Sequence, residues 1–340
     1  MKNKKWISLT AAVVLAVTAL PMTAFAAKKD GAEEKITKVT LNEVAHSIFY
    51  APQYVAIEEG YFAEEGLDLT LVTGFGADKV LTALISGEAD IGFMGAEASI
   101  YAYQEGATDP AVNFAQLTQR AGNFLVAREE MSDFKWEDLK GKKVLGGRKG
   151  GMPEMVFEYI LKKNGIDPQK DLTIDQSIDF GSTAAAFTGD DSAAYTVEFE
   201  PSATILEKEG AGYVVASLGE ASGYVPYTSY SAKESYMKEN PEIIQKFTNA
   251  LQKGMDYVQS HTPEEIAEVI APQFKGTDLD TITTIVERYY DQDTWKENLI
   301  FEKDSFELLQ DILEDAGELN TRAEYEKLVE TEYAQKACES

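Results

Sequence analysis

A glycine-rich loop with two cations has residue types that could bind a ligand. The stretch GRKGGMPEM, residues 147–155, places Arg148 and Lys149 beside glycines and directly before a helix-like segment. Gly150 and Gly151 permit close approach of the backbone, and the positive end of the following helix would face the bound group. The loop could hold an anion or the edge of a planar ligand, although at least one of the two cations is expected to be merely solvated. It lacks the Gly-Lys-Ser/Thr ending of a Walker loop.

A second glycine turn, Gly74-Phe75-Gly76, stands between a strand-like and a helix-like segment. Free backbone N–H groups at that helix start could hold an anion or a ligand oxygen. A plain strand-to-helix turn explains the same residues equally well. No third glycine follows at the spacing of a dinucleotide-binding fingerprint, so that type of site is excluded.

Two carboxylates are candidates for polar contacts to a ligand. In YTVEFEP, Glu198 and Glu200 are two residues apart and would share one face of a strand. Such a pair could do acid–base chemistry. Glu200 is better explained as a cap for the helix that begins at Pro201. Glu198, if it lies in a cleft, could accept hydrogen bonds from an amine or an amidine-like edge.

Further candidates lie in loops rather than on helical stripes, which favours ligand contact over core packing for part of the set. Arg120 could supply a cation for an anionic ligand. The other loop residues are His46, Ser47, Phe49 and Tyr50 in HSIFYAP and Tyr224 and Tyr227 in GYVPYTSY.

Nothing in the sequence indicates catalysis or a metal. There is no Gly-x-Ser-x-Gly elbow, no HExxH and no aspartate-rich calcium loop. Cys338 is the single cysteine, and the two histidines, His46 and His261, cannot build a zinc site by themselves. We therefore expect no enzyme activity and no cofactor. The formal net charge of −27 excludes nucleic acid as a partner, but not a small anion inside a cleft.

The N-terminal segment predicts export. Three lysines precede an apolar run from Trp6 to Leu20, and Ala24-Phe25-Ala26 supplies small residues for a leader peptidase. Residues 1–26 are typical of a signal peptide cleaved after Ala26, with an uncleaved membrane anchor as the alternative. We expect the mature protein to be soluble outside the cytoplasmic membrane.

The elements that must position these candidates alternate between short strands and helices from Lys38 onward, which predicts α/β architecture. A second such set begins near Asn123, and its helix 153–164 has Pro153 in the first turn and Gly165 after its end. We expect two α/β lobes, with the chain crossing between them near 119–124 and 223–229. The C-terminal portion is predicted to be helical, with helices that include 241–260, 263–271, 278–291 and 304–315.

The chain resembles the solute-binding proteins of ABC importers for nitrate, sulfonate, taurine and thiamine-pyrimidine-like compounds. The segment APQYVAIEEGYFAEEGLDLTLVTGFGADKVLTALISGEADIGFMG, residues 51–95, carries most of the likeness. Further matching stretches are LKGKKV at 139–144, Glu200-Pro201 and Val225-Pro226-Tyr227. The resemblance covers nearly the whole mature chain.

This resemblance implies a type II periplasmic-binding-protein fold with an interlobe ligand cleft. Lobe 1 would comprise residues 36–122 plus 227–340, and lobe 2 residues 123–226. It also implies permease subunits as partners, a monomeric protein and a periplasmic or cell-surface location. The loops 46–50, 74–77, 94–97 and 150–153 would touch the ligand, which adds the following candidates to those above: Met94, Gly95, Ala96, Glu97, Gly150, Gly151 and Met152.

One branch of this family contains fungal synthases of the thiamine pyrimidine, so an exported or pathway enzyme is the alternative function. Those synthases need a histidine before Ala-Pro and a cysteine-rich motif, whereas here Tyr50 precedes Ala51-Pro52. A cysteine for lipid attachment is also missing, which leaves tethering to the membrane open. Aromatic and acidic candidates outnumber basic ones, so we favour a planar, nitrogen-containing nutrient such as a thiamine-precursor pyrimidine over nitrate or a sulfonate.

Overall fold

A computed structural model describes residues 36–179 and 181–339. The predicted signal peptide, residues 1–26, lies outside the described residues. Within the described part of the chain, no helix is long and apolar enough to cross a membrane.

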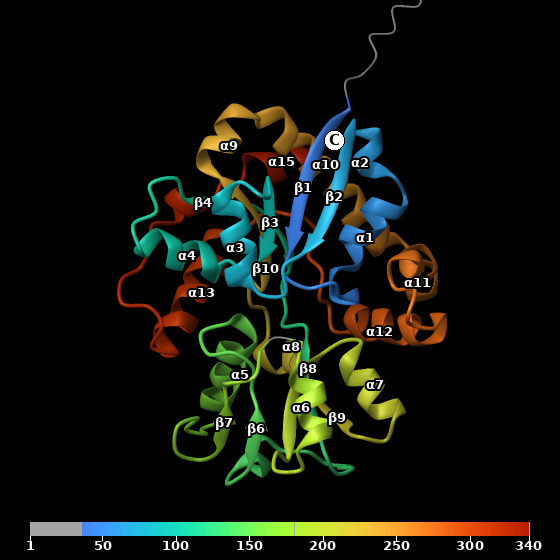
Figure 1. Cartoon of the computed structure of the whole chain (residues 1–340), viewed down its shortest axis with the longest axis vertical. Helices are drawn as coiled ribbons and strands as arrows, with labels where there is room; N and C mark the ends of the chain where they lie inside the picture. Colours follow the sequence, from blue (N-terminus) through green and yellow to red (C-terminus); the bar gives the residue numbers. More distant parts are fainter. Residues whose placement is uncertain (1–35, 180, 340) are drawn as a thin grey trace, which may run out of the picture. The chain divides into compact units, whose positions relative to one another are not determined.

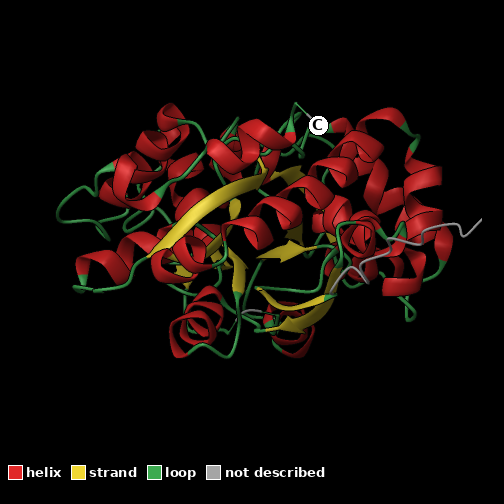
Figure 2. Ribbon diagram, turned by 90° about the horizontal axis from the view of Figure 1, so that it is seen from above, coloured by secondary structure: helices red, strands yellow, loops and turns green. Residues whose placement is uncertain are grey.

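The first of two five-stranded sheets has the order β2-β1-β3-β10-β4. Strands β1, β2 and β3 are parallel, and β10 runs antiparallel to both β3 and β4. Helices lie on both sides of these strands (Figure 2). The bounds are β1 Thr37–Glu43, β2 Leu67–Thr73, β3 Ile91–Met94, β4 Ala111–Thr118 and β10 Thr228–Lys233, with the helices η1 Ile48–Tyr50, α1 Ala51–Glu58, α2 Tyr61–Glu64, α3 Ala77–Ser86 and α4 Glu97–Gln104.

The second sheet has the order β7-β6-β8-β5-β9 and occupies the lower part of Figure 1. Strands β6, β7 and β8 are parallel, and β5 is antiparallel to β8. The bounds are β5 Asn123–Ala127, β6 Lys143–Leu145, β7 Thr173–Asp175, β8 Tyr195–Phe199 and β9 Tyr213–Ser217, with η2 Trp136–Leu139, α5 Met152–Lys163, α6 Thr183–Gly189, α7 Ser202–Lys208 and α8 Leu218–Ser222.

The remaining helices follow β10 and pack mainly on the first sheet. Helix α10 lies against α1, α2 and α15, whereas α13 contacts both α4 and α5 and so reaches the second sheet's helices. Amphipathic helices of this kind are stabilised by burial of their apolar face. The bounds are α9 Glu234–Glu239, α10 Pro241–Ser260, α11 Pro263–Ile270, η3 Ala271–Gln273, α12 Leu279–Asp291, α13 Lys303–Asp315, α14 Tyr325–Leu328 and α15 Glu332–Ala337.

The predicted α/β architecture with two lobes and an interlobe cleft is confirmed. We use the predicted ranges, 36–122 plus 227–340 and 123–226, as working definitions of lobe 1 and lobe 2. The chain passes from the first sheet to the second between β4 and β5, and it returns between α8 and β10.

Three strands were not predicted from the sequence: β7, a strand of three residues at the edge of its sheet, and the buried strands β4 and β10. Strand β4 is buried at every residue, so its sequence shows no alternation of polar and apolar side chains. Strand β10 was included in a segment expected to lead into helices, although Thr228–Ala232 is also entirely buried. Both strands lie at the position where the chain crosses between lobes, and their pairing partners are more than a hundred residues away in sequence.

Candidate functional site

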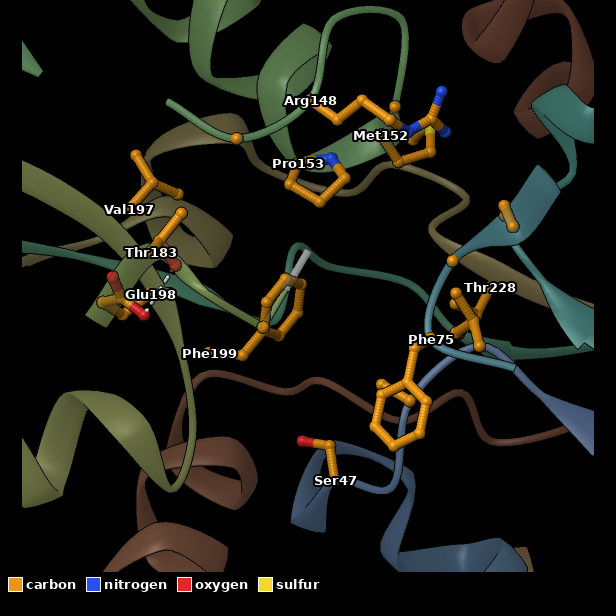
Figure 3. A pocket seen from close by; sticks show the side chains of 18 of the residues that line it. Ser47, Phe75, Arg148, Met152, Pro153, Thr183, Val197, Glu198, Phe199 and Thr228 are labelled. Atoms are coloured by element: carbon orange, nitrogen blue, oxygen red, sulfur yellow. Dashed lines mark hydrogen bonds between the residues drawn. The ribbon is translucent and has the colours of Figure 1, made fainter. Parts of the chain in front are cut away.

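A cavity of about 210 Å³ lies between the two lobes and is lined by residues of both (Figure 3). Lobe 1 contributes the loops that follow β1, β2 and β3, together with Tyr227 and Thr228. Lobe 2 contributes the loops that follow β6 and β8 and the first residues of α5 and α6. The site thus lies outside the carboxyl ends of parallel strands, which is where open α/β sheets usually bind ligands.

Most of the candidates predicted from the sequence meet in this cavity. From lobe 1 they are the loop residues after β1, the Phe75-Gly76 turn and the start of α4; from lobe 2 they are the start of α5 and the end of β8. The predicted residues that line it are His46, Ser47, Tyr50, Phe75, Gly76, Gly95, Glu97, Gly151, Met152, Glu198 and Tyr227.

Four other candidates lie behind the cavity wall. The ring of Phe49 is fully buried and packs against Tyr50 on one side and Tyr289 on the other. Three more do not line the cavity: Met94 and Ala96, which are buried, and Gly150.

Arg120 and Tyr224 lie outside the cavity and contact each other. The guanidinium carbon of Arg120 is 4.2 Å from the centroid of the Tyr224 ring. Arg120 also donates a hydrogen bond to the carbonyl oxygen of Gly219 over 3.2 Å. These contacts occupy both side chains at the point where the chain returns to lobe 1, so they support that crossing rather than this cavity.

Glu198 is a buried carboxylate on the cavity wall. One of its oxygens accepts a hydrogen bond from Thr183 over 3.0 Å (Figure 3). The other accepts one from Thr196 over 2.6 Å. Burial raises the pKa of Glu198 to about 7, and the two threonine hydroxyls oppose that rise. Each oxygen retains a free lone pair. Glu198 can therefore accept a further hydrogen bond, most strongly from an amine or a cationic N–H.

Glu97 is a second buried carboxylate on the wall, contributed by lobe 1. Burial raises its pKa to about 7, while its own N–H, the nearby Arg148 guanidinium and the Met152 N–H favour the charged form. Arg148 in turn lies 3.8 Å from Asp78 across the cleft, and both side chains are substantially exposed. Arg148 is thus the cation of the glycine-rich loop that faces the cavity.

Glu200 has the structural role expected from the sequence. Its carboxylate accepts hydrogen bonds from the backbone N–H of Thr204 over 2.9 Å, which caps the start of α7. Arg288 of α12 donates to the same carboxylate over 2.8 Å. Because these partners satisfy the Glu200 side chain, a ligand would find only its backbone near the cavity.

Aromatic rings supply much of the apolar wall. Phe75 of lobe 1 and Phe199 of lobe 2 face the same space in Figure 3, and Tyr50 and Tyr227 also line it. Phe75 is 59% exposed and has φ of +57°, a left-handed conformation that is unfavourable for a bulky residue. Strained, exposed residues persist where the surrounding structure imposes them, which often marks a binding site.

His46 is held by a buried carboxylate behind the wall. Its Nδ1 atom is 2.8 Å from Oε1 of Glu43, and this hydrogen bond raises the pKa of His46. Its Nε2 atom is 3.0 Å from the carbonyl oxygen of Gln273. Gln53 and Tyr54 also donate hydrogen bonds to Glu43. Because both ring nitrogens of His46 have partners within the protein, the His46 ring is held in place at the cavity wall.

Several lining residues were missed in the sequence. Thr183 starts α6, a short helix without a clear amphipathic pattern, and Thr228 starts the unpredicted strand β10. Phe199 and Val197 flank Glu198 in β8. Because side chains alternate between the two faces of a strand, the sequence pattern places them on the face opposite to Glu198. Three of the remaining lining residues lie in stretches already expected to contact a ligand: Gly147 in the glycine-rich loop, Ala77 in 74–77 and Pro153 in 150–153. The others carry small or apolar side chains at loop ends and were not named: Val44, Ala45, Gly146, Gly181, Pro201 and Ser202.

Among residues 36–179 and 181–339, no group of three or more His, Cys, Asp or Glu side chains is arranged to hold a metal ion. The polar groups that line the cavity are the carboxylates of Glu97 and Glu198, the internally paired Glu200, the Arg148 guanidinium, the His46 imidazole, several hydroxyls and backbone groups.

Comparison with known proteins matches residues 48–266 to the family model described as "NMT1/THI5 like". The chain is 47% identical over 332 residues to YtlA of Bacillus subtilis (strain 168), with 98% of each chain covered; YtlA is named as a binding protein without a stated ligand. It is 25% identical to the 4-amino-5-hydroxymethyl-2-methylpyrimidine phosphate synthase of Aspergillus parasiticus, covering 65% of this chain and 66% of the synthase. It is also 25% identical to the riboflavin-binding protein RibY of Chloroflexus aurantiacus, covering 68% and 65%.

Two solved structures share the fold at low sequence identity. The nitrate-binding protein NrtA of Synechocystis PCC 6803 has a TM-score of 0.71 at 16% identity, covering 90% of this chain and 89% of NrtA. The alkanesulfonate-binding protein SsuA of Xanthomonas axonopodis pv. citri, bound to MOPS, has a TM-score of 0.70 at 16% identity, covering 87% and 98%. Both are similar to this chain in the periplasmic-binding-protein fold.

Proposed function

The chain belongs to the NMT1/THI5-like family, and on that premise we propose that it is an extracytoplasmic solute-binding protein that captures a small nutrient for import by an ABC transporter. The name of YtlA, a full-length relative, and the names of the solved neighbours support a binding role. The interlobe cavity supports it as well, because a ligand held there contacts both lobes. The permease subunits of the transporter are the proposed protein partners.

We propose that the ligand is a planar, nitrogen-containing heteroaromatic molecule, such as an aminopyrimidine precursor of thiamine. The observation that carries this proposal is the Glu198 carboxylate, which is buried and lines the cavity, and whose two oxygens contact no cation among the residues that the structure describes. An exocyclic amine or a protonated ring nitrogen would complete its hydrogen bonding.

The balance of charge disfavours an oxyanion. Among the described residues that line the cavity, Glu97 and Glu198 are carboxylates without an ion-pair partner at hydrogen-bond distance, against the Arg148 guanidinium and the His46 imidazole, which is paired with Glu43. Glu200 is paired with Arg288, which it shares with Glu207. Above pH 7, where Glu97 and Glu198 are mostly charged, an anionic ligand in this cavity would be repelled by both at short range, where solvent screens poorly.

The aromatic lining suits a flat ring. Phe75 and Phe199 come from opposite lobes, so a planar ligand between them would join the lobes through ring contacts. The names of two relatives concern pyrimidine and flavin compounds, both of which are planar nitrogen heterocycles.

We propose binding without turnover. The pyrimidine synthases in the family need a histidine immediately before Ala-Pro, and the residue at that position here is Tyr50. Tyr50 is buried, and burial raises the pKa of its phenol well above the usual value, so it is a poor proton donor or acceptor near neutral pH.

A thermal-shift screen followed by calorimetry tests the function. The panel contains 4-amino-5-hydroxymethyl-2-methylpyrimidine, its 4-deamino analogue, riboflavin, taurine and nitrate. A ligand at one hundred times its Kd should raise the free energy of unfolding by about 2.7 kcal/mol. A shift with the aminopyrimidine that is much smaller with the deamino analogue supports the ligand class. A response to taurine or nitrate alone refutes the class but keeps the import role, and mass-spectrometric turnover of the bound compound favours the enzyme alternative.

A further inference from the structure

Glu97 connects the two lobes through the start of two helices. It is the first residue of α4 in lobe 1, and its side chain is almost fully buried. The backbone N–H groups of Glu97 itself and of Met152, the first residue of α5 in lobe 2, both stabilise its charged form. The positive ends of two helices thus converge on one carboxylate that the protein itself supplies.

One oxygen of this carboxylate is unused. Among the described residues, Oε2 of Glu97 is buried and has no hydrogen-bond partner, although the side chain lines the cavity. A buried, charged acceptor without a partner costs free energy, so native structures rarely keep one unless it has a function. The Glu97 carboxylate therefore keeps hydrogen-bonding capacity that no described residue uses, and because the side chain lines the cavity it is a candidate to accept a hydrogen bond from the ligand.

Gly95 leaves room for this carboxylate. A Cβ atom at Gly95 would clash with Oε2 of Glu97, so a larger residue there would displace the carboxylate from its observed place. The charged group that faces Glu97 from lobe 2 is Arg148, and the phenols of Tyr50, Tyr101 and Tyr227 are near enough for its charge to affect them. The Glu97 carboxylate thus lies near the start of α5 in the opposite lobe.

We propose that Glu97 is the specificity-determining anion of the cavity: it lies at the N-terminus of α5 in place of an oxyanion ligand, and it selects ligands that present a hydrogen-bond donor to its carboxylate. This inference deepens the proposed function and rests on it. A ligand that offers one donor to Glu97 in lobe 1 and another to Glu198 in lobe 2 satisfies a carboxylate on each side of the cleft. A 4-amino-5-hydroxymethylpyrimidine has two such donors, the amine and the hydroxyl.

Exchange of the carboxylate for an amide is the direct test. Glu97→Gln keeps the shape of the side chain but removes the charge, which leaves the α5 N-terminus and Arg148 available to an anion. By calorimetry at pH 8, nitrate and methanesulfonate should bind this variant at least about tenfold more tightly than the wild type. Glu97→Asp keeps the charge and should not gain oxyanion affinity. Glu130→Gln, an exposed substitution of the same kind, should behave like the wild type.

The outcomes separate this inference from the proposed function. Equal oxyanion affinity in the wild type and in Glu97→Gln overturns the role of Glu97, even if the wild type binds the aminopyrimidine. Wild-type protein that binds nitrate or methanesulfonate with micromolar Kd overturns both the role of Glu97 and the heteroaromatic ligand class. A gain that is confined to Glu97→Gln supports the inference, whichever heteroaromatic compound proves to be the natural ligand.

A second measurement does not depend on folding of the Glu97 variant. In a His46→Gln, Glu198→Gln double variant, Glu97 is the remaining lining carboxyl whose pKa is raised to about 7. Nitrate stays fully charged across this range, so its affinity should rise at least about tenfold from pH 8.5 to pH 6 as Glu97 takes up a proton. Nitrate affinity that does not change with pH in this variant contradicts the inference.

Discussion

The hydroxyl of Ser47 donates a 2.9 Å hydrogen bond to the backbone carbonyl oxygen of Glu200, and this bond joins lobe 1 to lobe 2 at the cavity. Both residues are buried. On another side of the cleft, the hydroxyl of Tyr101 donates to the carbonyl oxygen of Gly150 over 3.2 Å, again between the lobes. These bonds exist only while the lobes are in contact, so they stabilise the closed arrangement selectively.

The first prediction concerns the Ser47 bond. Ser47→Ala should weaken binding of the ligand by about two- to tenfold, because a net hydrogen bond of about 0.5–1.5 kcal/mol is lost from the closed state. Calorimetry with the best ligand from the screen measures this. Thr248→Val is the matched control, since its buried hydroxyl donates to Ile244 within lobe 1. It should lower the free energy of unfolding and leave the Kd unchanged; a Ser47→Ala variant that binds like the wild type contradicts the role of the bond.

The second prediction is lobe closure. A ligand between the lobes should shift the population from open to closed, and the radius of gyration should fall. Small-angle scattering with and without saturating ligand measures this change. Ser47→Ala should begin with a larger mean radius in the absence of ligand. An unchanged radius at saturation in the wild type would count against hinge closure.

The third prediction separates the two ligand classes. Glu198→Gln should weaken binding of an aminopyrimidine by at least about tenfold, because a charge-assisted hydrogen bond is lost. Arg148→Ala should have little effect, since its contact with Asp78 is long and exposed. For a sulfonate, Arg148→Ala should weaken binding more than Glu198→Gln does. Calorimetry on the two variants decides, and a Glu198→Gln protein with wild-type affinity for the aminopyrimidine would refute its role.

The sequence predicted the helices better than the strands, for a physical reason. The C-terminal helices α10, α11, α12 and α13 begin and end within one residue of their predicted bounds, because each carries an amphipathic repeat and three of them begin near a proline or a capping residue. Strands β4 and β10 have neither signal. Strand β4 is buried throughout and β10 is buried from Thr228 to Ala232, and their pairing depends on the return of the chain from lobe 2.

The candidate site shows a similar division. Turn glycines and strand-end residues such as Gly76, Gly151 and Glu198 could be named in advance, because local sequence shows where a strand ends and a helix starts. The roles of Phe49 and Arg120 could not be. Whether an aromatic ring or a guanidinium at a loop faces the cavity depends on packing partners such as Tyr289 and Tyr224, which are distant in sequence.

The fourth prediction is a pH dependence of the protein without ligand. Burial raises the pKa of Glu97 and of Glu198 from 4.5 to about 7, so folding favours their protonated forms. The stability that each contributes is complete below the unfolded pKa and is lost as the pH rises through about 7. Unfolding free energy should therefore fall from pH 5 to pH 8.

Glu198→Gln removes one of these two groups, so the fall in unfolding free energy between pH 5 and pH 8 should be smaller by up to about 3 kcal/mol. The raised pKa of His46 acts in the same direction and is common to both proteins, so it cancels in the comparison. Denaturant unfolding at each pH measures the difference. If the unfolding free energy of Glu198→Gln falls with pH as steeply as that of the wild type and of the exposed control Glu130→Gln, the pKa of Glu198 is not raised in the folded protein.

The last prediction concerns Phe75. Its left-handed backbone should lower the free energy of unfolding, while its exposed ring should strengthen ligand binding. Phe75→Gly relieves a strain of about 1–2 kcal/mol, partly offset by the greater freedom of glycine in the unfolded chain, so the free energy of unfolding should rise slightly. The same change removes the ring and should weaken binding of a planar ligand by about two- to tenfold.

Phe75→Ala separates the two effects, because it keeps the strain but lacks the ring: affinity should fall with no gain in stability. Phe75→Tyr should preserve affinity. Denaturant unfolding and calorimetry on the three variants measure both quantities, and a Phe75→Ala protein that binds the planar ligand as tightly as the wild type would show that the ring does not contact it.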